Sequence, residues 1–219
     1  MFAQGIVVDP SNAGSADGAT VTANFGRANE ALVAELHGKY FEQAYRGNVY
    51  YCSTATAGVV IPISSTLTPV YTIWNPAGSG KLCVPVVSVF GHNATTSVLG
   101  GLIWMATTNA GSAIGTAAPI VSFTNVGPIN ANLGSGKVAA TRFATSASTL
   151  TIIAAPTIWR HTGVTVAANT VATATAGWVW RDDWDGGGII PPGNAIHLMG
   201  TTAVALTLNV TTVFVEVPI

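Results

Sequence analysis

Two apolar runs separated by a short turn set the hydrophobic pattern of this chain. Residues 70–74 and 82–90 are rich in Val, Ile, Tyr and Phe, which suit the pleated, buried surface of a sheet. Gly78 and Gly80 lie in the turn, where glycine adopts positive φ at little cost. Pro85 has no N–H, so its strand should lie at a sheet edge or carry a bulge there. The segment predicts a β-hairpin.

The same alternation of strand and turn continues from residue 47 to the C-terminus. Residues 204–217 are expected to form a closing strand, and in residues 204–210 apolar side chains occupy every second position with Ala, Thr or Asn between, so one face of this strand is predicted to be buried. No helical period interrupts the series, and many short strands without helical crossovers are typical of sandwiches and jelly rolls. We therefore expect a mostly β protein, an antiparallel, jelly-roll-like β-sandwich over residues 47–219.

The N-terminal part of the chain has a different pattern. Residues 1–24 are rich in Gly, Ala, Ser and Asn without a period, which indicates an extended arm that is ordered only when bound. Ala28, Leu32 and Leu36 follow at four-residue spacing and predict one short amphipathic helix within residues 27–38. Residues 1–46 are thus expected to form an arm and helix preceding the sandwich.

Aromatic residues cluster where this arm enters the sandwich, and two more share one face of a later strand. Aromatic side chains dominate protein cores and interfaces, so we interpret both groups as packing or contact residues. The predicted interface residues are Tyr40, Phe41, Tyr45, Tyr50, Trp178 and Trp180.

The composition indicates that much of the surface is covered by another subunit. Only 8% of the residues are charged, against about 25% in ordinary soluble domains, and 49% are hydrophobic. No run approaches the roughly 18 apolar residues of a membrane-spanning helix, so a membrane partner is not expected. The net charge of −1 provides no basic field for nucleic acid. A homo-oligomer is the expected explanation.

The sequence offers little for catalysis. No Asp or Glu lies between Glu42 and Asp182, which removes paired-carboxylate chemistry from most of the sandwich. The Ser and Thr residues do not stand in nucleophile motifs. The histidines lie in different predicted elements without metal-ligand spacing: His37, His92, His161 and His197. We expect neither an enzyme nor a bound cofactor.

One segment superficially resembles a phosphate-binding loop. GSGK at residues 78–81 matches the end of the P-loop pattern, but its first glycine position holds Asn75 and its hydroxyl position holds Leu82. A strand follows instead of a helix whose N-terminus could bind phosphate. We interpret the segment as a turn.

Two further groups of residues are open to more than one interpretation. Cys52 and Cys83 lie in apolar, strand-like surroundings, which favours small buried side chains, although a disulfide between them is possible. Asp182, Asp183 and Asp185 could provide oxygen ligands for a cation. Their spacing does not match a full calcium loop, so a solvated turn is the favoured interpretation.

Three stretches carry a resemblance to a known class of proteins. They are residues 36–51 (LHGKYFEQAYRGNVYY), residues 74–81 (WNPAGSGK), and residues 190–219, where IPPGNAIHL leads to a terminal VFVEVPI. Together they resemble virion structural proteins of tailed bacteriophages, in particular capsid decoration or cement proteins. The resemblance implies a β-rich subunit on the capsid surface, bound to the major capsid protein or another virion subunit.

The resemblance also implies a homotrimer, because such proteins often occupy three-fold axes. As a capsid subunit, the chain would dock through its arm and apolar strand faces. An alternative is a receptor-binding or fibre-tip module, in which residues 178–185 would contact host surface glycan. Neither function requires a catalytic residue.

Overall fold

The computed structural model describes the chain in ten segments: residues 4–6, 20–22, 39–93, 100–108, 120–123, 125–145, 150–152, 156–166, 179–202 and 206–219. In 4–6, 20–22, 120–123, 150–152 and 163–166 the description covers the backbone alone. The elements are β1 (Gln4–Ile6), β2 (Thr20–Thr22), α1 (Phe41–Tyr45), β3 (Val49–Ser53), β4 (Val59–Val60), β5 (Tyr71–Asn75), β6 (Lys81–His92), β7 (Gly100–Thr107), β8 (Ile120–Phe123), β9 (Ile129–Asn130), β10 (Arg142–Ala144), β11 (Leu150–Ile152), β12 (Thr157–Val166), β13 (Val179–Asp183), β14 (Asn194–Gly200) and β15 (Thr207–Pro218).

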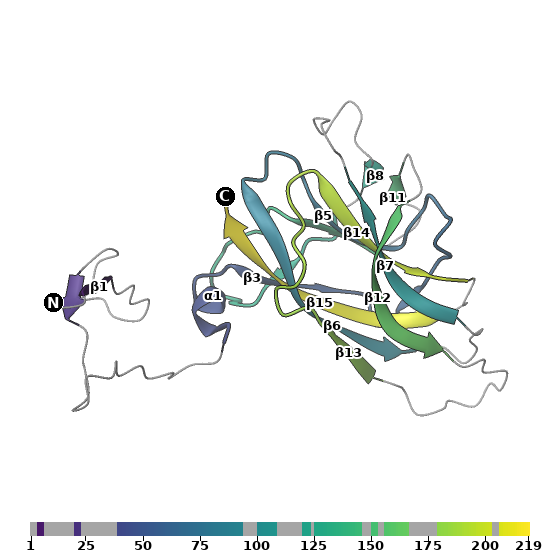
Figure 1. The fold of residues 1–219 in the computed structure, drawn as a ribbon, viewed down its shortest axis with the longest axis horizontal. Helices are drawn as coiled ribbons and strands as arrows, with labels where there is room; N and C mark the ends of the chain where they lie inside the picture. The colour runs from purple at the N-terminus through teal and green to yellow at the C-terminus, as the bar shows by residue number, and fades with distance from the viewer. Residues whose placement is uncertain are drawn as a thin grey trace.

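Two antiparallel sheets packed face to face form the body of the protein (Figure 1). One has the order β13-β6-β15-β3-β9, with β4 also paired to β15, and the other has the order β10-β5-β14-β7-β12. The principal strands in chain order are β3, β5, β6, β7, β12, β13, β14 and β15. In the first sheet β13, β6, β15 and β3 lie side by side, which are the sixth, third, eighth and first of these strands. In the second sheet the order is β5, β14, β7 and β12, which are the second, seventh, fourth and fifth. This order is that of a jelly roll, so the predicted fold is confirmed.

The predicted hairpin of residues 70–74 and 82–90 is wrong in its pairing. Both strands form, as β5 and β6, but β5 pairs with β10 and β14, whereas β6 pairs with β13 and β15 in the opposite sheet. The turn between them, with Gly78 at φ 76° and Gly80 at φ 66°, therefore forms a corner from one sheet to the other. Its glycines suit either connection, because both need a tight reversal.

The two long central strands confirm two details of the sequence pattern. In β15, Leu208 and Val210 are buried and the intervening Asn209 is half-buried, as the alternation predicted. In β6, Pro85 faces Phe214 while Val87 faces Val213, so Val86 is the extra residue of a bulge. β13 pairs with β6 only from Val87 onward, so Pro85 lies at the bulge and beyond the end of the β13 ladder.

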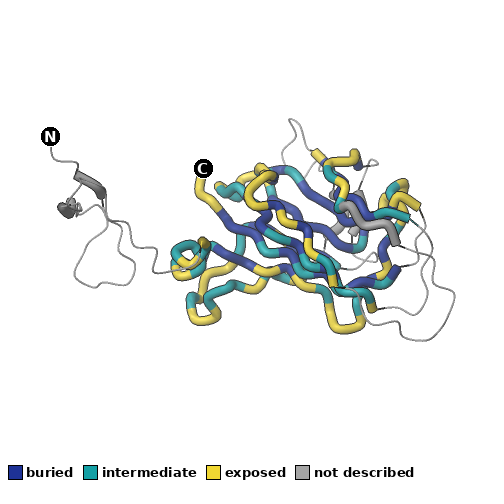
Figure 2. Tube along the Cα trace, turned by 60° about the horizontal axis from the view of Figure 1, so that its bottom comes forward, coloured by how far each residue is buried: buried dark blue, intermediate teal, exposed yellow. Residues whose placement is uncertain are grey.

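The hydrophobic core lies between the sheets and is rich in aromatic rings. Figure 2 shows the buried trace following the central strands, with exposed positions at loops and ends. Tyr71, at 0% exposure, meets Phe143 and Trp104 edge-on with ring centroids 5.0 and 6.0 Å apart. Its hydroxyl lies 2.9 Å from both the Cys52 carbonyl oxygen and Thr212 Oγ1, so the buried polar group has partners.

The helix predicted within residues 27–38 lies outside the described residues. The described helix is α1, a five-residue segment, where Arg46 forms an i,i+4 ion pair with Glu42. Tyr40 and Ala44 pack on a buried cluster of Val49, Val86 and Val215, which lies on the six-stranded sheet. The segment before β3 thereby covers part of the outer face of that sheet.

Candidate interaction site

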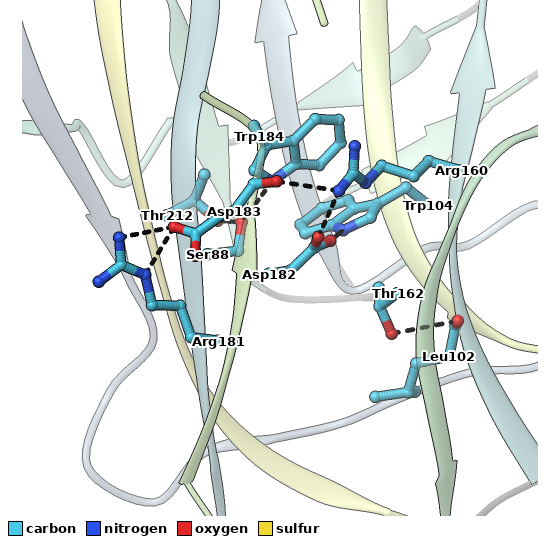
Figure 3. Close-up of polar contacts among 10 residues, drawn as sticks. All are labelled: Ser88, Leu102, Trp104, Arg160, Thr162, Arg181, Asp182, Asp183, Trp184 and Thr212. Atoms are coloured by element: carbon cyan, nitrogen blue, oxygen red, sulfur yellow. Dashed lines mark hydrogen bonds and ion pairs between the residues drawn. The ribbon is translucent and has the colours of Figure 1, made fainter. Parts of the chain in front are cut away.

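An ion pair joins the two sheets at the edge formed by β12 and β13 (Figure 3). Asp182 is only 6% exposed, and its Oδ1 accepts a hydrogen bond of 2.7 Å from Arg160 Nη2. The same Nη2 donates to the Asp183 carbonyl oxygen at 3.0 Å. Trp104 Nε1 donates to the second carboxylate oxygen, Oδ2, at 3.2 Å. A buried carboxylate paired in this way clamps the open edge of the sandwich.

Three indole rings surround this ion pair. The Trp184 ring packs edge-on against Trp104, with centroids 5.4 Å apart, and at 43° against Trp159, with centroids 5.3 Å apart. The Arg160 guanidinium lies 4.8 Å from the centre of the Trp184 ring, within cation–π range. A Cβ at Gly188 would lie 3.0 Å from Trp159 and 3.1 Å from Trp184, so glycine lets both rings close on the backbone. The cluster rigidifies the loop after β13.

An apolar groove of about 300 Å³ opens beside this cluster. It lies where the start of β12 meets the end of β7, the start of β14 and the loop before β14. Ile158, Trp159 and Ile189 line it, with exposures of 57%, 37% and 51%. Its polar groups are few: Thr108, Thr157 and Asn194, whose Nδ2 already donates to the Pro191 and Pro192 carbonyl oxygens. A groove of this character fits apolar side chains better than a polar ligand.

The described part of the N-terminal segment is anchored beside the same cluster. Lys39, half-exposed Tyr40 and Asp185 form a small polar cluster. The Lys39 ammonium pairs with the Asp185 carboxylate, and Tyr40 Oη donates to Asp185 Oδ1 at 3.0 Å. These contacts raise the pKa of Lys39 and lower the pKa of Asp185, and the hydrogen bond between the two side chains is the largest cause of both shifts. Lys39, the first residue of the described segment 39–93, is therefore fixed beside the residue that follows Trp184.

A second exposed apolar area surrounds α1 and β9, and we name it the β9-edge surface. Phe41 and Tyr45 stack with centroids 6.1 Å apart, and Tyr51 faces Ile129 across the β3–β9 pair. Asn132 Nδ2 donates to the Tyr45 carbonyl oxygen at 3.1 Å, which brings the loop after β9 against α1. The members of this surface are Phe41, Tyr45, Tyr51, Ile129, Leu133 and Val138. Leu133 and Val138 are 86% and 85% exposed, so these side chains are almost entirely in solvent.

The predicted interface residues fall in different environments. Phe41 and Tyr45 lie on the β9-edge surface, and Tyr40 is half-buried against Asp185. Tyr50 is 3% exposed and stacks on Phe214 at 5.5 Å, so it belongs to the core and cannot contact a partner in this fold.

The two tryptophans predicted for the interface have different outcomes. Trp180 stacks on Phe90 at 5.0 Å and 11° and packs, partly buried, against the core, so one face of its ring is occupied within the chain. Trp178 lies outside the described residues.

The three carboxylates proposed as cation ligands each have their own basic partner. Asp182 pairs with Arg160, Asp183 with Arg181, and Asp185 with Lys39. Within the described segments, no group of three or more His, Cys, Asp or Glu residues is arranged to hold a metal ion. The turn after β13 is thus built from separate ion pairs.

The two cysteines are free, fully buried thiols. Burial raises the pKa of both Cys52 and Cys83 well above the ordinary thiol range. A neutral, inaccessible thiol is a poor nucleophile, so these side chains act as small core residues.

Sequence reasoning missed the residues that build this edge. Arg160, Trp159 and Ile158 lie in a Thr- and Ala-rich part of the chain without a motif, and their partners follow more than 20 residues later. One signal was present, because Arg160 is a lone charged residue in a stretch of uncharged residues. A charged side chain that approaches a protein core is usually paired. Its partner could not be read from spacing.

Comparison with known proteins yields no relative. No protein-family model, no curated protein and no solved structure matches this chain. Within the described segments, no helix is long and apolar enough to span a membrane.

Proposed function

We propose that this protein is a structural subunit on the capsid surface of a tailed-bacteriophage particle. The observation that carries the proposal is the β9-edge surface, where Leu133 and Val138 are over 80% exposed beside Phe41, Tyr45, Tyr51 and Ile129. Exposed apolar groups gathered in one place mark contact surfaces, and three of these residues, Phe41, Tyr45 and Tyr51, belong to residues 36–51, one of the stretches that carry the phage resemblance. The jelly roll agrees with a capsid role, since viral capsid domains use it, although a fold alone does not establish a function.

The partner on the particle would be the major capsid protein or another virion subunit. The charged residues on the segments that carry the β9-edge surface are few: Glu42 and Arg46 pair with each other at α1, and Lys137 lies on the loop after β9. Lys137 Nζ donates to the Arg46 carbonyl oxygen at 2.7 Å and thereby joins the loop after β9 to the end of α1. An exposed apolar surface with few charged neighbours suits a permanent contact with another subunit.

The alternative of glycan binding at residues 178–185 gains no support from the described residues. Sugar recognition by tryptophan needs an open indole face. Trp180 stacks on Phe90, and Trp184 is 3% exposed within the indole cluster. The nearby carboxylates are engaged with arginine and lysine.

The test is whether the chain is part of the purified particle. We expect mass spectrometry of gradient-purified virions, produced by the genome that encodes this chain, to detect it in many copies. In virions carrying Leu133→Asp, incorporation should fall strongly, because the new charge would have to be desolvated at the contact. Ser65→Asp, at an exposed position on another loop, is the matched control. Absence of the wild-type chain from the particles would refute the proposal.

We further propose that the functional unit is a homotrimer. A chain with only 8% charged residues is best explained by an obligate contact, and contacts above roughly 2,000 Å² are more apolar than ordinary surface. The number three comes from the phage resemblance. Light scattering of the purified protein at micromolar concentration should give three times the chain mass. A monomer would refute the oligomer, whereas a dimer or pentamer would refute the number alone.

A further inference from the structure

We propose that the apolar groove beside Trp159 binds the N-terminal segment of a neighbouring copy, with the run Ile6-Val7-Val8 as the inserted part. The groove is lined by apolar groups and offers about 300 Å³, enough for two or three aliphatic side chains. Three consecutive β-branched residues are available in the N-terminal segment, where the rest of residues 1–24 is mostly small or polar. The inference rests on the proposed oligomer and names the contact that would hold it together.

The backbone next to the groove is suited to strand addition. β12 is the edge strand of the five-stranded sheet, and among the described strands it pairs with β7 alone. Its first residues, including Ile158 and Trp159, line the groove. An extended peptide that pairs with such an edge gains main-chain hydrogen bonds and places alternate side chains in the adjoining groove. A β-branched run is the kind of sequence that adopts this extended form.

The two N-terminal strands form a small sheet that further pairing would stabilise. β1 and β2 pair with each other, and neither pairs with any other described strand. A lone two-stranded hairpin is marginally stable in water and requires further strands or a packing surface. An exposed sheet edge with an apolar groove beside it provides both.

The N-terminal segment is long enough to reach the groove of a neighbouring copy in the proposed oligomer. Lys39 is fixed to Asp185, one residue from Trp184, whose ring packs against Trp159 beside the groove. Val8 precedes Lys39 by 31 residues, a reach of up to about 100 Å when extended. A domain of this size is only about 40 Å across. Exchange within a closed ring fills every groove with one arm, which is how symmetric oligomers use heterologous contacts.

Thiol cross-linking between two differently tagged, co-expressed variants tests the inference. One chain carries Val7→Cys and the other Ile158→Cys, a position that is 57% exposed and tolerates replacement. The native Cys52 and Cys83 are fully buried and should not react. With a flexible bis-maleimide, we expect most of the cross-linked product to contain one chain of each tag. In the first matched control, Ser15→Cys in the arm replaces Val7→Cys. In the second, Val179→Cys on β13, at a 74% exposed position, replaces Ile158→Cys. Both control mixtures should give little cross-linked product.

Each outcome decides the inference. A mixed-tag product from Val7→Cys and Ile158→Cys supports exchange between copies. If a double variant carrying both cysteines cross-links within one chain at high dilution while the mixture gives no mixed product, the arm occupies its own groove and exchange is refuted. Equal products from the control positions, or no product, would also refute it. Because the experiment uses purified protein without particles, its failure is separate from absence of the chain from virions.

Discussion

Replacing Arg160 with alanine should lower the free energy of unfolding by about 3 kcal/mol, because it leaves a buried carboxylate without its cation. Asp182 is 6% exposed, and the substitution would remove its 2.7 Å hydrogen bond with Arg160 Nη2. The cation–π contact with Trp184 would be lost as well. The Arg160 side chain is 36% exposed, so water can replace part of the lost contact, which keeps the expected effect near the lower end for buried pairs. Urea unfolding at fixed protein concentration measures it.

The two residues that flank Asp182 on β13 form a matched control. Arg181 pairs with Asp183, but these side chains are 66% and 57% exposed, so Arg181→Ala should cost less than about 1 kcal/mol. A double variant, Arg160→Ala with Asp182→Asn, should recover part of the loss, since no buried charge then remains. If Arg160→Ala and Arg181→Ala cost the same, the proposed inter-sheet clamp is wrong.

Acid should destabilise the protein through His197. This ring is fully buried, with Nδ1 2.7 Å from Thr72 Oγ1 and Nε2 2.7 Å from Thr107 Oγ1. Burial lowers its pKa from 6.5 to about 3, so the folded protein keeps the neutral form. The neutral ring donates from one nitrogen and accepts at the other, which matches two hydroxyl partners.

The direction of the effect follows from where each state binds the proton. Below pH 6.5 the unfolded chain protonates His197, whereas the folded protein does so only near pH 3. The contribution of His197 to the free energy of unfolding is therefore fully present above pH 6.5, and it falls by about 1.4 kcal/mol for each pH unit of acidification toward pH 3. Between about pH 7.5 and pH 4.5 the loss from this group should be about 3 kcal/mol.

A pair of histidine variants isolates this contribution. His197→Gln keeps hydrogen-bonding atoms at the site but cannot titrate. Between about pH 7.5 and pH 4.5, its loss in free energy of unfolding should therefore be smaller than that of the wild type by about 3 kcal/mol. His161→Gln changes an exposed ring and should leave the difference unchanged. The comparison uses urea unfolding at both pH values. An equal pH dependence in wild type and His197→Gln would show that the buried ring is not the cause.

Much of the fold could be read from local patterns, because burial on one face of a strand repeats every second residue. The alternation around Leu208 and Val210 identified a strand and its inward face, and Pro85 indicated a bulge that the structure contains. The same patterns did not reveal which strands pair. A turn with Gly78 and Gly80 suits a hairpin and a corner between sheets equally, and the choice depends on the partners β10 and β14, distant in sequence.

The candidate site was less accessible to sequence reasoning than the fold. Tyr50 and Trp180 have the composition of interface residues, yet they stack on Phe214 and Phe90 inside the domain. An aromatic ring gains similar energy from core and interface burial, so its type alone does not separate the two environments.

The sequence by itself determined that this chain forms a β-sandwich, that its surface is poor in charge, and that its carboxylates are confined to a few places. These properties depend on residue type and short-range spacing. Only the tertiary structure decided that Arg160 meets Asp182, that His197 lies between Thr72 and Thr107, and that Trp159 borders a groove near Lys39. Each of these contacts joins strands from distant parts of the chain, and their register is set by the packing of the whole core rather than by any local preference.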